Sequence, residues 1–215
     1  MTRPLLNWVR SHAIARLLMA GGALGAVIAI AVFLTAAAPN NDEIAQGKQI
    51  FRFDTFGDEQ RWTDALGLHE VIESAVDPLT ALSVGLKVDV DALPAELRTA
   101  LLNNQVDLTD PATTVALFKL NAVVGVIGQV QNINGVDRLT RVGVSCALCH
   151  STVDNSLLPG IGHRLDGWPN TELNPGAILA LSPNLSSDVK AVYNSWGPGK
   201  FDPRFNIDGQ STPLV

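Results

Sequence analysis

Both cysteines of this 215-residue chain lie in one short stretch, residues 143–152, which reads GVSCALCHST. Cys146 and Cys149 are three residues apart, and His150 follows directly. On a helical turn, this spacing brings two sulfur atoms and an imidazole ring close together. Thiolate and imidazole are common ligands of metal ions in proteins. The stretch could serve as a disulfide, half a zinc site, a redox dithiol or the attachment point of a haem.

Several uses of such a motif are not supported by the rest of the sequence. A disulfide between residues three apart closes a very small loop and occurs mainly in catalytic redox pairs. Those pairs usually open a helix in a thioredoxin-like unit, whose alternating strands and helices are not predicted here. A structural zinc site needs four ligands, but the chain has no second cysteine pair. The next histidine, His163, has no partner histidine three to five residues away.

The remaining use of Cys-x-x-Cys-His is covalent attachment of one c-type haem. Two thiols three residues apart can join the two vinyl groups along one edge of the porphyrin. The histidine that follows then lies under the ring centre and ligates the iron. We therefore expect Cys146 and Cys149 to be thioether anchors and His150 to be the proximal iron ligand.

An apolar segment near the N-terminus predicts a membrane location. Residues 17–34 contain no charged or polar side chain, and residues 35–38 extend the apolar run. About 20 residues of helix span a bilayer core of about 30 Å. Arg3, Arg10 and Arg16 precede the segment, so the positive-inside rule places the N-terminus in the cytoplasm. We expect a single-pass anchor in the inner membrane, with the C-terminal domain in the periplasm.

The alternative is a cleaved signal peptide, because residues 35–39, TAAAP, offer small residues for cleavage. The product would then be a soluble periplasmic protein. Both alternatives export the bulk of the chain, which suits a c-type haem because bacteria attach it outside the cytoplasm. Removing residues 1–38 changes the formal charge from −6 to −9, because they hold three arginines and no acid. An acidic domain argues against nucleic acid as a partner.

The middle of the chain predicts helices and one β-hairpin. Residues 39–47 are polar and are interpreted as a tether. Apolar spacing predicts a helix over about 58–75 that includes His69. Further helices are expected to begin near Pro94 and at Asp110-Pro111. The β-branched residues after 121 and the Asn134-Gly135 turn predict a hairpin whose second strand runs into Cys146. Short helices are expected near 175–181 and 187–196.

At this point the chain resembles the bacterial c-type cytochromes. Residues 47–51, GKQIF, resemble the helix that precedes the haem motif in that family, and residues 146–167 resemble the haem motif with its following loop. In small cytochromes c, that loop carries a proline whose carbonyl oxygen accepts a hydrogen bond from the proximal histidine. Here His163 stands where the proline would be. About 95 residues separate GKQIF from Cys146, where small cytochromes have only a few.

That longer separation, together with residues 194–202, NSWGPGKFD, resembles larger cytochromes related to the di-haem cytochrome c peroxidase type. The resemblance implies a mainly α fold. A transmembrane helix would lead into a cytochrome c-like helical haem domain with an inserted helical region and a β-hairpin. The expected regions are a flank and anchor over 1–38, the tether over 39–47, a helical region over 48–121, and the hairpin with the haem-binding region over 122–215.

The sixth iron ligand is the least determined part of the site. Electron-transfer cytochromes commonly use methionine, but the only methionines are Met1 and Met19, on the membrane side of the chain. His69 is the candidate distal ligand on the predicted helix. The alternative is a distal ligand from a further domain or subunit, because no C-terminal helix is visible before residue 215 and we expect the natural chain to continue. Arg164, Trp168, Trp196 and Lys200 are of the types that meet haem propionates, and Leu148, Leu157, Leu158, Ile161 and Leu165 are expected to line the pocket.

These features predict a membrane-tethered, periplasm-facing c-type cytochrome with one haem. It would transfer single electrons between weakly bound redox protein partners. The alternative is a haem peroxidase or oxygenase, which needs an acid–base group over an open distal face. His69 is the only residue that the sequence nominates for that role.

Overall fold

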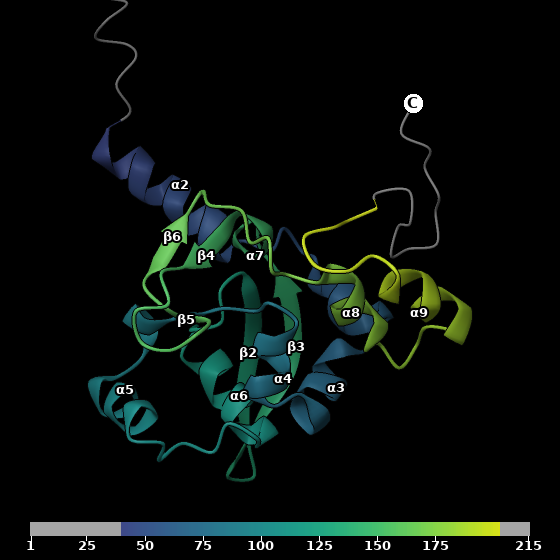
Figure 1. Ribbon diagram of the computed structural model, residues 1–215, viewed down its shortest axis with the longest axis horizontal. Coiled ribbons are helices and arrows are strands. Elements are labelled where there is room, and N and C mark those ends of the chain that lie inside the picture. Colours follow the sequence, from purple (N-terminus) through teal and green to yellow (C-terminus); the bar gives the residue numbers. More distant parts are fainter. Residues whose placement is uncertain (1–39, 203–215) are drawn as a thin grey trace, which may run out of the picture. The chain divides into compact units, whose positions relative to one another are not determined.

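The computed structural model describes residues 40–202 (Figure 1). The chain divides into two compact units between Gly47 and Lys48. In the first unit, residues 40–47 form the exposed start of a helix. Asn40 opens this helix with a reciprocal pair of contacts, in which the Glu43 N–H donates to Asn40 Oδ1 (2.8 Å) and the Asn40 N–H donates to Glu43 Oε2 (3.3 Å). Such a capping box satisfies two otherwise unpaired backbone donors, so the expected polar tether is helical from Asn41.

Helices make up much of the described chain. The α-helices are α2 (Asn41–Phe53), α3 (Leu68–Ala75), α4 (Pro78–Ser83), α5 (Ala95–Leu102), α6 (Pro111–Lys119), α7 (Ala147–His150), α8 (Pro175–Ala180) and α9 (Ser187–Asn194). A π-helical segment, η1 (Gln60–Ala65), precedes α3, and a 3-10 turn, η2 (Val90–Ala92), precedes α5.

The strands form three two-stranded sheets within residues 40–202. They are β1 (Val88–Asp89), β2 (Val126–Ile133), β3 (Val136–Val144), β4 (Ser151–Val153), β5 (Ile161–Gly162) and β6 (Arg164–Asp166). The hairpin β2–β3 is antiparallel and closes with Ile133 opposite Val136. Strand β1 pairs in parallel with β5, and β4 pairs antiparallel with β6.

The mainly α fold predicted from the sequence is wrong. Strands of these sheets lie directly before and directly after the segment that contains the cysteines. Residues 151–166 were interpreted as loop. Their strands are two or three residues long, too short for a period-two pattern to be visible in the sequence. The predicted transmembrane segment lies outside the described residues. Among residues 40–202, no helix has both the length and the apolar character needed to cross a membrane.

Several predicted elements are confirmed. Asp110 caps α6, with its Oδ1 accepting the Ala112 N–H at 2.8 Å, and Pro111 occupies the first turn. The hairpin turns at Asn134-Gly135, where both residues have positive φ. The predicted helix over 58–75 is instead broken at Gly67, whose φ of 63° belongs to the left-handed region that favours glycine.

The hydrophobic core of the second unit lies between the hairpin and the helices that pack on it, α3 and α6 (Figure 1). Leu139 and Val142 of β3 are almost fully buried, and Leu68 at the start of α3 is completely buried. Leu148 of α7 joins the same core. The short helix that carries the cysteines is therefore anchored on the main hydrophobic core of the unit.

A buried threonine ties η1 to β3. The Thr63 hydroxyl donates to the Val142 carbonyl oxygen and accepts the Val142 N–H, both at 2.8 Å. Replacing Thr63 with valine keeps the shape but leaves both backbone groups unpaired in the core. We expect Thr63→Val to lower the free energy of unfolding by about 2 kcal/mol.

Urea denaturation measures this change. Thr99→Val is the matched control, because the Thr99 hydroxyl donates to Ala95 O at 3.0 Å on an exposed helix face. The control is expected to change stability by less than about 0.5 kcal/mol. Equal losses in the two variants would show that the buried pair has no special role.

Candidate functional site

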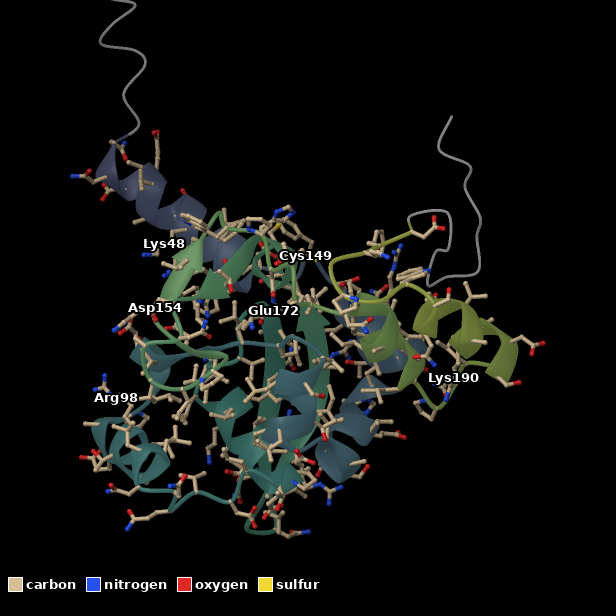
Figure 2. All side chains as sticks on the ribbon, in the orientation of Figure 1. Lys48, Arg98, Cys149, Asp154, Glu172 and Lys190 are labelled. Carbon is tan, nitrogen blue, oxygen red and sulfur yellow. The ribbon has the colours of Figure 1, made fainter. Side chains whose placement is uncertain are left out.

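The three motif residues share one exposed face. Helix α7 starts directly after Cys146, and Cys146, Cys149 and His150 are exposed, whereas Ala147 and Leu148 are buried. Positions i, i+3 and i+4 of a helical turn point the same way. Both cysteines are free thiols. Figure 2 labels Cys149 on this short helix. The structure therefore brings two sulfur atoms and one imidazole together at the surface.

The buried side of α7 is closely packed. Leu148 enters the main core, while Ala147 packs in a smaller cluster with Val124, Val153 and the half-buried Phe51. On the same side, the Gly125 carbonyl oxygen accepts the Ser145 N–H at 3.0 Å. Gly125 has a φ of 74°, and a Cβ at this position would lie 2.0 Å from the Leu148 nitrogen. The backbone of α7 thus rests directly on a glycine backbone.

The end of α2 lies beside the motif, although about 95 residues separate them. Phe51 packs in the Ala147 cluster, and the Ser145 hydroxyl donates to the Arg52 carbonyl oxygen at 2.9 Å. Phe51 is the last residue of the GKQIF stretch. Residues 54–144 lie between these two segments in the sequence, and after them the chain again lies beside the end of α2.

The segment after the motif holds the far end of α7. The His150 carbonyl oxygen accepts the Gly167 N–H, and the Cys149 carbonyl oxygen accepts the Asn170 N–H, both at 2.9 Å. Strand β4 then pairs with β6, and the Asp166 carboxylate accepts from Ser151 Oγ (2.9 Å) and from Arg52 Nε (2.7 Å). The backbone of the motif is therefore fixed on several sides.

Among the described residues, the His150 imidazole has no hydrogen bond or ion pair. The nearby loop residue His163 differs, because its Nδ1 lies 2.9 Å from Asp91 Oδ1. The hydrogen bond that the His163 ring donates to the Asp91 carboxylate, together with the negative charge of Asp91, raises the pKa of His163. His163 is thus engaged with η2, while His150 is available to a ligand.

The structure does not bring His69 to the motif. His69 lies on α3 beside Asn134, Val136 and Arg138, at the turn end of the hairpin. The motif follows the opposite end of β3, about 20 Å away at about 3.3 Å per residue. His69 Nδ1 is buried and has no hydrogen-bond partner within the described part of the chain, and Nε2 lies 4.0 Å from Glu70 Oε1. His69 is therefore not positioned to be the distal ligand in this structure.

The expected pocket-lining leucines also lie elsewhere. Leu148 and Ile161 are buried in the protein core, and Leu157 and Leu158 pack against it, so these four side chains are not the open lining of a site beside the motif. Leu165 is half-buried on β6. The sequence indicated that they are apolar and near the motif, but it did not indicate the face on which they lie.

The four candidates for propionate contact have different environments. Arg164 is buried, with its Nε 3.0 Å from Asp89 Oδ2 and its guanidinium 5.7 Å from the centre of the Phe53 ring. Trp196 is buried and stacks edge-on with Tyr193. Trp168 and Lys200 are exposed. Only these last two are accessible to a bound group from the surface.

Gly125 and Arg52 are the site residues that the sequence analysis missed. A glycine inside the apolar, β-branched run 122–130 is a signal for close backbone approach. Nothing in the sequence identifies its neighbour, which comes from residues 147–148. The role of Arg52 as acceptor for Ser145 depends on a contact across 93 residues and has no local signal.

The environment of Cys149 disfavours a reactive thiolate. Cys149 is exposed as a residue, but partial desolvation of its thiol, with a smaller contribution from the neighbouring Cys146, raises its pKa. Redox-active cysteines instead have a lowered pKa. A raised pKa leaves Cys149 a smaller thiolate fraction than an ordinary thiol has, which disfavours disulfide exchange.

This shift predicts slow alkylation of Cys149 in the haem-free chain. A raised pKa leaves a smaller thiolate fraction at any given pH, and only the thiolate reacts. In a Cys146→Ser variant, iodoacetamide is expected to alkylate Cys149 more slowly at pH 8 in the folded chain than in urea. The midpoint of the plot of alkylation rate against pH is expected at a higher pH in the folded chain. If that midpoint lay at the same or a lower pH in the folded chain than in the unfolded chain, the raised pKa of Cys149 would be contradicted.

Across residues 40–202, no group of three or more His, Cys, Asp or Glu side chains is arranged to hold a bare metal ion. The site thus consists of two thiols and one imidazole on a surface helix whose backbone is held by hydrogen bonds.

No protein-family model, curated protein or solved structure matches this chain.

Proposed function

We propose that this chain is a c-type cytochrome that carries one haem and transfers single electrons between redox proteins. Cys146 and Cys149 would hold the porphyrin through thioether bonds, and His150 would ligate the iron. One observation carries the proposal: at the exposed face of α7 and its N-cap lie two free thiols and an imidazole that has no partner among residues 40–202. The motif Cys-x-x-Cys-His is the attachment sequence of c-type haem.

The surroundings of the motif fit this group. The two sulfur atoms and the imidazole have no competing partner among residues 40–202, so binding would break no existing interaction of theirs. The backbone beneath them is held by Gly125, Gly167 and Asn170. Leu148 fixes the opposite side of the helix in the core. The chain therefore holds the backbone of the motif by several hydrogen bonds and leaves its three side chains exposed.

The bound haem would supply an iron that alternates between ferric and ferrous states. The residues of the chain would orient it and limit its exposure to water. The surface position of α7 leaves an edge of the site accessible to a protein partner, as electron transfer requires.

We propose that the chain acts outside the cytoplasm. The apolar run 17–38 preceded by three arginines is typical of an export signal, and the acidic remainder has no feature of a nucleic-acid-binding protein. Fractionation of cells that express the full chain is expected to recover it with the periplasm or with the inner membrane. Recovery in the cytoplasm would contradict this part of the proposal.

The enzyme alternative has weaker support. A peroxidase needs an acid–base group over its open coordination position, and the only residue nominated for it, His69, lies at the far end of the hairpin. Visible spectra with and without carbon monoxide and peroxide separate the two functions. An electron carrier whose sixth ligand comes from a further domain or subunit is expected to give a low-spin spectrum that neither compound changes, whereas a high-spin ferric form that reacts with peroxide would favour the enzyme.

A further inference from the structure

Three large aromatic side chains are strongly exposed in the described part of the chain. Phe56 is 72%, Trp168 is 63% and Phe201 is 59% exposed. By contrast, Trp62 and Trp196 are each only 8% exposed. Exposed apolar side chains that gather at one place usually mark a binding surface.

The loop of Trp168 contacts the motif directly, and the segments of Phe56 and Phe201 contact residues next to the motif or to that loop. Trp168 directly follows Gly167, whose N–H donates to the His150 carbonyl oxygen, and it comes shortly before Asn170, which donates to Cys149. Figure 1 shows this loop, between β6 and α8, passing close to α7. Trp168 is therefore held beside the motif by two backbone hydrogen bonds.

Phe56 lies in the turn between α2 and η1. Its φ of 53° is unusual for a bulky residue, and its N–H donates to Asp54 Oδ1 at 2.8 Å. The neighbouring Thr55 side chain packs over Gly143, three residues before Cys146. A hydrogen-bonded turn thus holds an aromatic ring in solvent near the start of the motif.

Phe201 lies in the segment after α9. Its ring stacks edge-on against Trp196, with the ring centres 5.4 Å apart. The Gly199 N–H donates to the Leu173 carbonyl oxygen at 2.7 Å, which places this segment along residues 171–173, the continuation of the loop that carries Trp168. Lys200, next to Phe201, is exposed and adds a positive charge.

We infer that Trp168, together with Phe56 and Phe201, forms the apolar wall on which the porphyrin attached at Cys146 and Cys149 packs. The inference rests on the proposed function and assigns its pocket to these three side chains. A porphyrin has flat apolar faces and two carboxylates. Aromatic rings pack well on such faces, and the Lys200 ammonium complements a carboxylate at the rim. Four of the five apolar side chains expected from the sequence, all except Leu165, pack in or against the core instead.

Residue-level oxidative footprinting tests the inference without a mutation in the wall. The full chain is prepared with haem attached, and a Cys146→Ser/Cys149→Ser chain is prepared without it. Hydroxyl-radical modification of Trp168, Phe56 and Phe201 is expected to fall several-fold when haem is attached. Leu79 and Leu102 are the internal controls, because both are exposed on other helices, and their modification is expected to stay constant. Unchanged modification of Trp168 in the haem-loaded chain would overturn the inference.

A second measurement does not depend on the haem-free chain. In the haem-loaded protein, Trp168→Ser admits water to the porphyrin, and this lowers the reduction potential of the iron. Leu102→Ser is the matched control and is expected to leave the potential unchanged. Equal reduction potentials in both variants and the parent would refute the packing of the porphyrin on Trp168, while covalent haem binding would remain supported. Absence of covalent haem from the parent would instead refute the proposed function, together with the inference.

Discussion

Gly125→Ala is expected to be strongly destabilising and to displace the helix that carries the cysteines. An added Cβ would lie 2.0 Å from the nitrogen and 2.2 Å from the Cα of Leu148, and both are backbone atoms that cannot rotate away. The positive φ of Gly125 adds a cost of about 1–2 kcal/mol for a residue with a side chain. Overpacking adds about 1–3 kcal/mol more. We therefore expect a total loss of about 2–5 kcal/mol in urea denaturation.

Gly135→Ala separates the two contributions. Gly135 also has a positive φ, 85°, but a Cβ there would meet no atom within 4 Å. The control is expected to lose only the conformational cost, about 1–2 kcal/mol. If Gly125→Ala were no more destabilising than Gly135→Ala, the close approach between Gly125 and α7 would be absent from the protein in solution.

His150→Ala is expected to remove the proximal ligand while leaving both attachment cysteines in place. The haem that remains attached should lose the low-spin visible spectrum of the parent. The physical reason is that the imidazole of His150 is the side chain on the α7 face able to ligate iron beside the two sulfur atoms. Added imidazole is expected to restore the low-spin form, because it replaces the missing ligand.

His163→Ala and His69→Ala are the matched controls for His150→Ala. His163 is engaged with Asp91, and His69 lies beside the hairpin turn, so neither substitution is expected to change the spectrum. A parent-like spectrum in His150→Ala would contradict its role as a ligand. A changed spectrum in His69→Ala would show that α3 approaches the iron in solution, against the structure.

Local chemistry in the sequence predicted several elements correctly. The Asp110-Pro111 pair sets the start of α6, because the carboxylate caps the first turn and proline suits it. The Asn134-Gly135 pair sets the hairpin turn, because both residues accept positive φ. The motif residues lie at and within the short helix α7, and their role as haem ligands stays a prediction.

Long-range contacts account for what the sequence did not predict. Apolar spacing over 58–75 suited one helix, but Gly67 introduces a left-handed residue and the segment becomes two helices. The pairing of β1 with β5 joins residues more than 70 positions apart and follows no local pattern. Leu148 was expected to face a ligand, but α7 packs against the hairpin region in such a way that the Leu148 side chain lies in the core. Which face of a short helix is buried depends on these contacts.

Intact-protein mass spectrometry is the most direct test of the central claim. The full chain is expressed in a bacterial host that attaches c-type haem, and the purified product is weighed under denaturing conditions. The proposal predicts a mass equal to the polypeptide plus one haem, and loss of that addition in Cys146→Ser/Cys149→Ser. A product with the mass of the polypeptide alone, with both thiols still open to alkylation, would contradict it.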